Sequence, residues 1–272
     1  IPAGEFAVRS AVRLKSGVCL AGSGLFTVLR FSGNGPGVLV GTDVHDVRVR
    51  DLTIQGSGTD DSVEDRGGVV LNLETGTGEV PVNLVIERVR VEGLRCSGVT
   101  IHGNGTVVAT DVTVRDCTFE DLGNQGVLGY FARRILVDHC RFRSMGRSGT
   151  IFARCRDITV RDCSVRTTGW HGIEVGDESE GFCIEGNAIE DSGDHAGILA
   201  EQAAHRGIIA HNRITAPRFR GIQLNNKPAV AAVREVTVTD NIIDMAGSSE
   251  QPGILIYGDT TYTVDDCHVA GN

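Results

Sequence analysis

Short apolar runs that begin with glycine recur along the chain, with apolar residues at the second and fourth places. The clearest example is Gly172-Ile173-Glu174-Val175-Gly176. From Gly68 onward, the leading glycines are 30, 28, 23, 23, 25, 24 and 32 residues apart. A short unit repeated with insertions is typical of a solenoid, in which each unit buries its apolar face only against its neighbours.

Each unit contains two further strand-like runs after the glycine-led rung. Ile158-Thr159-Val160 is an example of the first, and Asp162-Cys163-Ser164-Val165 shows the polar pair and apolar alternation that follow. Their period of two predicts strands, and the unit leaves no room for a helix. We therefore predict an all-β solenoid of about ten coils and three parallel sheets, forming a single domain over residues 1–272. Because the pattern starts and stops within a unit, the native chain is expected to extend beyond both ends.

These features resemble a known family. The Gly-Ile-x-Leu rungs, the bend residues Asn187, Asn212 and Asn241, and the opening 1–6 and 14–24 are similar to the pectate-lyase-like superfamily. The resemblance covers essentially the whole chain and implies a right-handed, single-stranded parallel β-helix with substrate along the first sheet. That superfamily includes polysaccharide lyases, uronate epimerases, hydrolases and non-catalytic modules. The resemblance also favours an extracellular or cell-surface location.

Composition narrows the possible partners. The net charge of −9 argues against nucleic acid, since phosphate binding needs a basic surface. No apolar run approaches the ~20 residues that a membrane span requires. The 36 glycines and six prolines suit a fold with many tight bends, where glycine supplies positive φ.

The cysteines predict packing rather than metal binding. Cys117, Cys140 and Cys163 are 23 residues apart, at one place in successive units. Asn187, Asn212, Asn241 and Cys267 are expected at the same place in later units. Like residues in register form a stacking ladder, whereas a zinc site favours close pairs such as Cys-x-x-Cys, which do not occur.

The outer face of the first sheet is the predicted site. The third and fifth residues of each rung should point outward, because side chains alternate along a strand. With the residues just before each glycine, the candidates on this face are His102, Tyr130, Arg147, Trp170, His171, Glu174, His195, Glu201, Arg220, Gln223, Asn225 and Tyr257. Lys227, two residues beyond Asn225, could either reach a substrate carboxylate or belong only to a turn. Aromatic, amide and carboxylate side chains suit an oligo- or polysaccharide, or another polyhydroxylated small molecule.

Lyase or epimerase chemistry on a uronate needs a base, a cation for the substrate carboxyl group, and an acid. His171 or His195 could be the base, Arg147 or Arg220 the cation, and Tyr130 or the other histidine the acid. His171, His195 and Glu201 are the trio that we would test by substitution. The sequence lacks the Asp-Pro-His motif of mannuronan epimerases and the aspartate cluster that holds calcium in pectate lyases.

Three alternatives stay open. An inverting hydrolase would use Glu174 and Glu201, whose Cα atoms should lie ~8 Å apart. The same groups would also serve a small-molecule isomerase or cyclase, and the chain could be a non-catalytic binding or surface module. No cofactor or metal ligand is predicted, although the acidic segment 59–66 could hold calcium. The sequence leaves the oligomeric state open.

Overall fold

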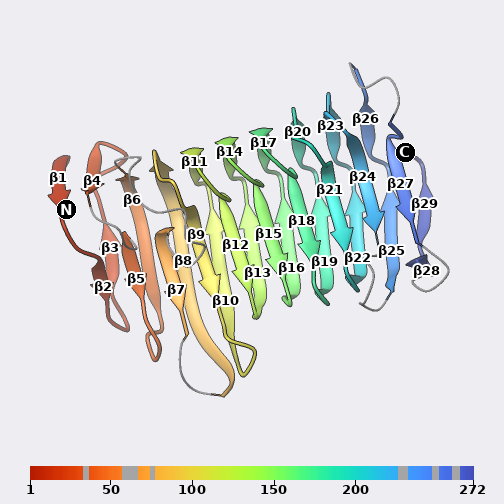
Figure 1. Cartoon of the computed structure of the whole chain (residues 1–272). Coiled ribbons are helices and arrows are strands. Elements are labelled where there is room, and N and C mark those ends of the chain that lie inside the picture. The colour runs from red at the N-terminus through yellow and green to blue at the C-terminus, as the bar shows by residue number, and fades with distance from the viewer. Residues whose placement is uncertain (33–36, 57–66, 74–76, 226–231, 247–250, 259–263) are drawn as a thin grey trace.

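The computed structural model describes residues 1–32, 37–56, 67–73, 77–225, 232–246, 251–258 and 264–272. The strands stack as successive rungs along one axis, and the pairings between them are parallel (Figure 1). The acidic segment 59–66 and Lys227 lie outside the described residues. Within those described, no helix has the length and hydropathy that crossing a membrane requires.

Ten strands form the first wall of the solenoid, which is a sheet of its own. They are β2 (Val12–Leu14), β5 (Val38–Val40), β7 (Gly67–Asn72), β9 (Ser97–His102), β12 (Val127–Tyr130), β15 (Thr150–Ala153), β18 (Ile173–Gly176), β21 (Ala196–Glu201), β24 (Arg220–Asn225) and β27 (Ile254–Tyr257).

The other strands form a second and a third wall. The second wall contains β3 (Cys19–Ala21), β10 (Val107–Arg115), β13 (Ala132–Asp138), β16 (Arg156–Arg161), β19 (Glu180–Glu185), β22 (His205–Ala210), β25 (Val233–Thr239), β28 (Val264–Asp265) and β29 (His268–Ala270). The third contains β1 (Gly4–Val8), β4 (Thr27–Phe31), β11 (Thr118–Leu122), β14 (Arg141–Met145), β17 (Ser164–Thr168), β20 (Ala188–Glu190), β23 (Arg213–Thr215) and β26 (Ile242–Asp244).

Two long strands join the second and third walls. β6 (Val47–Gln55) and β8 (Gly78–Glu92) run through both, so that β8 pairs with β10 and also with β11. The predicted coil of three parallel strands is confirmed. Its second and third walls nevertheless belong to one hydrogen-bonded sheet of 19 strands, because these two strands continue through the bend.

The core follows the alternation expected from the sequence. Ile173 and Val175 are fully buried in the core, whereas Glu174 between them is not part of it. On the third wall, Phe119 and Phe142 stack with ring centroids 5.0 Å apart. Large side chains of the third wall thus fill the interior from the side opposite the glycine-led rungs.

That packing explains the glycine at the start of each rung. A Cβ on Gly126 would lie 2.2 Å from Cδ1 of Phe142, and one on Gly221 would lie 2.4 Å from Cγ2 of Ile243. These two glycines do not have positive φ. Positive φ is found at other glycines, such as Gly17, Gly181 and Gly186, whereas the glycines that begin the rungs are needed because they let the third wall approach closely.

We expect Gly126→Ala to lower the free energy of unfolding by roughly 2 kcal/mol, the usual cost of overpacking a filled core. Urea denaturation measures this change. Gly41→Ala is the matched control, because a Cβ there has no atom within 4 Å. Equal denaturation midpoints for the two variants would show that the interior has room beside Phe142.

Polar residues supply most of the left-handed turns between the second and third walls. Asp116, His139, Asp162, His211 and Asp240 occupy one place in successive coils, with φ between 50° and 56°. Aspartate tolerates this conformation better than most residues because its short side chain can hydrogen-bond to nearby backbone. The polar pair in each unit therefore begins with the residue that turns the chain.

The second residue of each pair forms a buried ladder inside the turn. Asn187 Nδ2 donates to Asn212 Oδ1 at 2.9 Å, and Asn212 Nδ2 donates to Asn241 Oδ1 at 2.9 Å. Asn241 Nδ2 then donates to Oδ1 of Asn272 at 2.8 Å. The assignment of Cys267 to this ladder is wrong: that cysteine lies between β28 and β29, and Asn272 takes the ladder place.

The cysteine thiols of the ladder are expected to be unreactive. A hydrogen bond with Cys140 and burial raise the pKa of the Cys163 thiol, and burial raises that of Cys140. A low thiolate fraction makes a cysteine a poor nucleophile and a poor metal ligand. Cys163 N–H donates to Asn187 Oδ1 at 3.0 Å, which links the cysteine and asparagine parts.

Candidate functional site

The predicted site residues separate into two groups at opposite ends of the first-wall strands. Between the groups, the outward side chains of Val70, Leu128 and Leu199 are only 2%, 1% and 3% exposed, although they lie outside the core cluster. The middle of this face is therefore largely buried and apolar, although Thr100, Glu174 and Gln223 occupy the same column. The other polar candidates lie at the start and the end of the strands.

The group at the start of the strands occupies the bend from the third wall to the first. We call it the bend cluster, and its members are Arg147, Trp170, His171, Glu174, His195 and Arg220. Backbone hydrogen bonds fix their order: Trp170 N–H donates to the carbonyl of Arg147, and Arg220 N–H donates to that of His195, each at 3.1 Å. Residues 23 to 25 positions apart thus become neighbours.

His171 is held rigidly in the bend cluster. Its Nδ1 accepts the backbone N–H of Ala196 at 3.2 Å, which assigns the proton of the neutral ring to Nε2. Nε2 lies 3.8 Å from Oε2 of Glu174. Because the lone pair at Nδ1 is engaged and the side chain is buried, His171 is suited to donate a hydrogen bond from Nε2–H rather than to act as a base.

His195 lies on the open side of the same cluster. Its ring centroid is 4.8 Å from that of His171 and 5.8 Å from that of Trp170, which it meets edge-on. The side chain is exposed, and its ring nitrogens make no hydrogen bond to any residue the structure describes. Of the two histidines, His195 has the lone pair available to accept a proton.

Arginines lie on both sides of the histidines. The Arg147 guanidinium stacks 4.0 Å from the ring centroid of Trp170, which is 40% exposed. Arg220 donates Nη1–H to Gln223 Oε1 at 2.8 Å, while its Nε has no hydrogen-bond partner among the described residues. Burial lowers the pKa of Arg220. A desolvated guanidinium with a free donor is suited to binding a carboxylate.

The group at the end of the strands is separate. The rings of His102 and Tyr130 lie 5.7 Å apart, and Asn225 pairs in register with both Glu201 and Tyr257. Glu201 is buried and accepts a hydrogen bond from Gln202 Nε2 at 2.7 Å.

This separation divides the expected catalytic trio. Glu201 ends β21, whereas His195 immediately precedes it, so their Cα atoms lie ~20 Å apart at the rise of a strand. Glu201 and Tyr130 therefore do not share a site with the two histidines. The register Glu174↔Leu199 places Glu201 two residues beyond the partner of Glu174, consistent with the ~8 Å expected between the glutamates.

A cavity of about 790 Å³ lies at the turn from the first to the second wall. Among the residues lining it are Phe131 and Arg154, whose guanidinium is 5.3 Å from the Phe131 ring centroid. Both residues have positive φ, 48° and 53°. Sequence reasoning missed this cavity because it stopped at the fifth place of each rung, one residue before the turn.

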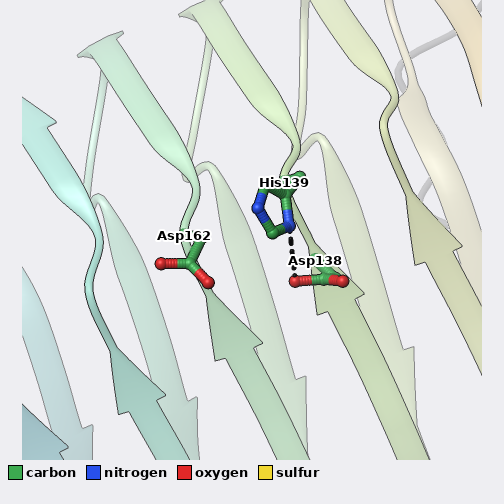
Figure 2. A group of neighbouring side chains, drawn as sticks. All are labelled: Asp138, His139 and Asp162. Atoms are coloured by element: carbon green, nitrogen blue, oxygen red, sulfur yellow. Dashed lines mark hydrogen bonds and ion pairs between the residues drawn. The ribbon is translucent and has the colours of Figure 1, made fainter.

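Asp138, His139 and Asp162 form a further polar cluster beside the turn from the second to the third wall (Figure 2). His139 Nδ1 hydrogen-bonds to Asp138 Oδ1 at 2.8 Å, and Arg161 Nε donates to the same oxygen at 2.9 Å. Burial would raise the pKa of Asp138, but the contacts with Arg161 and His139 hold it below its usual value. The 23-residue spacing of the polar pairs was the signal that could have predicted this cluster.

The donor set of this cluster does not fit calcium. Calcium takes six to eight oxygen ligands, whereas here an imidazole and a guanidinium already occupy the central carboxylate. We therefore derive no metal-dependent step from it.

Comparison with known proteins shows the fold. The profile of the family described as "Right handed beta helix region" matches residues 14–196 and 137–272. No curated protein matches the sequence.

Several solved structures are similar. The A-module of mannuronan C-5 epimerase AlgE4 from Azotobacter vinelandii has a TM-score of 0.55 and 20% identity, covering 100% of this chain and 90% of its own. The periplasmic alginate epimerase AlgG has a TM-score of 0.66 and 14% identity, covering 99% and 79%. Tailspike protein 2 from an Escherichia coli O157:H7 bacteriophage has a TM-score of 0.72 and 15% identity, covering 98% and 38%.

Proposed function

Since the chain belongs to the right-handed beta helix family, we propose that the bend cluster is the acid/base site of a carbohydrate-active enzyme of the polysaccharide lyase or uronate epimerase type. One observation carries the proposal: two histidine rings 4.8 Å apart lie between two arginines at an open edge of the first wall. Structural neighbours named as mannuronan and alginate epimerases support this substrate class.

The proposed roles follow from the contacts. His195 removes the proton next to the carboxyl group of a uronate, and the charge that develops on that carboxyl group is stabilised by the Arg220 guanidinium. The imidazolium formed on His195 then gives that proton to the leaving oxygen, so that the glycosidic C–O bond breaks as the C=C bond forms, while Nε2–H of His171 donates a hydrogen bond to the same oxygen. Glu174, whose Oε2 lies 3.8 Å from Nε2 of His171, adds negative charge beside the histidine pair and so favours the imidazolium that forms on His195.

The geometry favours the lyase type over the epimerase type. A sugar does not fit between rings 4.8 Å apart, so both histidines face the substrate from one side. Epimerisation requires a proton donor on the opposite face of the sugar. Tyr130, the sequence candidate for that role, lies at the other end of the wall.

We propose an extracellular or cell-surface location, and we assign no calcium site. Calcium would have to be held outside the Asp138 cluster, whose donors do not fit it. Structural neighbours named as a periplasmic epimerase and as a bacteriophage tailspike support the expectation of an extracellular or cell-surface location.

We expect incubation with polyuronates, such as polymannuronate and polygalacturonate, to give an unsaturated product that absorbs in the near ultraviolet. New reducing ends without that absorbance would instead assign an inverting hydrolase using Glu174 and Glu201, for which the register provides the spacing. A changed sugar configuration without cleavage would assign an epimerase. If none of these three changes occurred, the proposal of an enzyme would be rejected and a non-catalytic module would remain.

A further inference from the structure

A shallow groove of about 370 Å³ lies on the outer face of the third wall, around the corner from the bend cluster. It crosses β14, β17, β20 and β23, which pair in this order. Its lining includes the arginines Arg141, Arg143, Arg166 and Arg213, and the single carboxylate of Glu190. The chain as a whole carries a net charge of −9, so this groove has the opposite charge from the rest of the molecule.

The shape of the groove follows from one column of side chains. The register aligns Arg141 with Ser164, Ser164 with Ala188, and Ala188 with Arg213. The two small residues form a floor between two long ones. Three rung spacings separate the arginines, which places their Cα atoms about 14 Å apart.

Ion pairs neutralise only part of this charge. Arg166 Nε donates to Glu190 Oε2 at 2.7 Å, and Arg143 Nη1 lies 3.5 Å from Glu120 Oε1. Arg141 and Arg213 are exposed, and neither makes an ion pair with a residue that the structure describes. The two ends of the groove are therefore available to anions.

We propose that this groove binds a segment of an anionic polysaccharide that lies across the four strands, with acidic groups at Arg141 and Arg213. Guanidinium groups recognise carboxylate or sulfate through paired N–H donors. The hydroxyl groups of Ser164 and Thr215 offer hydrogen bonds to the sugar between them.

Other macromolecules match these observations less well. A protein partner needs a buried aromatic or apolar centre, whereas the floor here is serine and alanine. Single-stranded nucleic acid needs exposed aromatic platforms along a basic track, and the lining has none that faces outward, since Phe142 is buried in the core. A hydrated polyanion requires only separated cations and hydroxyl contacts.

The groove extends the proposed function, because it adds a second binding surface for the polymer that the bend cluster would act on. Binding at this groove does not require turnover. β17 ends at Thr168, two residues before Trp170, so the third wall leads directly into the bend cluster. The groove and the two histidines therefore lie on the same coils, on neighbouring faces of the solenoid. Binding at the groove is measurable whether or not the bend cluster is catalytic.

The test is binding of polyuronate oligomers to the double variant Arg141→Ala/Arg213→Ala, measured by calorimetry at two salt concentrations. We expect affinity to fall about tenfold and its salt dependence to decrease, as for two exposed charge contacts. Arg48→Ala is the matched control, because Arg48 is also exposed but lies on β6 in the second wall. It should retain full affinity.

Unchanged affinity in the double variant would overturn the proposal. So would binding of a single-stranded DNA oligomer as tight as that of the polyuronate, or equal binding of a neutral glucan. Tighter binding of a sulfated polysaccharide would support the groove and assign sulfate as its anion. Repeating the titration in a His195→Ala background separates the two proposals, because loss of turnover there should leave the effect of the two arginines intact.

Discussion

His195→Ala is expected to lower kcat on a polyuronate by about 10²- to 10⁴-fold, the usual contribution of a positioned general base. His195 is the histidine with an available lone pair, and its backbone carbonyl accepts the N–H of Arg220 on the next rung. Because its side chain is exposed, the substitution should leave the fold intact. Turnover is measured as near-ultraviolet absorbance, and folding by urea denaturation.

The control for this substitution is His268→Ala. His268 is also exposed but belongs to β29 on the second wall, away from the bend cluster. Its variant should keep the full turnover number. If His195→Ala and His268→Ala turned over substrate equally well, the bend cluster would not be the catalytic site.

Asn212→Ala is expected to lower the free energy of unfolding by roughly 3 kcal/mol, because it leaves several buried polar groups without partners. Asn212 Oδ1 accepts hydrogen bonds from both N–H and Nδ2 of Asn187, at 3.0 and 2.9 Å. Its own Nδ2 donates to Ile184 O and to Asn241 Oδ1, each at 2.9 Å. Urea denaturation gives the difference in unfolding free energy.

Comparison with Cys163→Ala separates hydrogen bonding from packing in this ladder. Cys163 holds the equivalent place two coils earlier, and its sulfur is only a weak hydrogen-bond partner. We expect its substitution to cost roughly 1 kcal/mol, as for loss of a small buried apolar group. Equal losses in the two variants would mean that the ladder contributes through packing alone.

The fold was predictable because its signal is local and repeated. Alternation placed Ile173 and Val175 in the core, and the spacing of the leading glycines gave the parallel rungs. The resemblance to pectate-lyase-like β-helices is confirmed for the fold. The reason for those glycines was not predictable, because the Phe142 ring that requires Gly126 lies 16 residues further along the chain.

At the C-terminal end of the ladder, the sequence repeat gave a wrong alignment. Cys117, Cys140 and Cys163 were correctly aligned by their spacing, but Cys267 was misplaced. The last unit differs in length from the earlier ones, so equal position in a sequence pattern did not mean equal position in the coil. Hydrogen bonding from Asn241 to Asn272 settles the register there.

The sequence by itself determined the parallel solenoid and its inward and outward faces, and it supplied the side chains of the candidate site. These depend on the alternation of neighbouring residues, which is a property of each strand alone. Only the tertiary structure decided which candidates meet: His171, His195 and Arg220 lie on adjacent rungs, whereas Glu201 lies ~20 Å from His195, at the other end of its strand. The physical reason is that two residues about one repeat apart in the sequence come into contact only when they occupy the same position along their rungs.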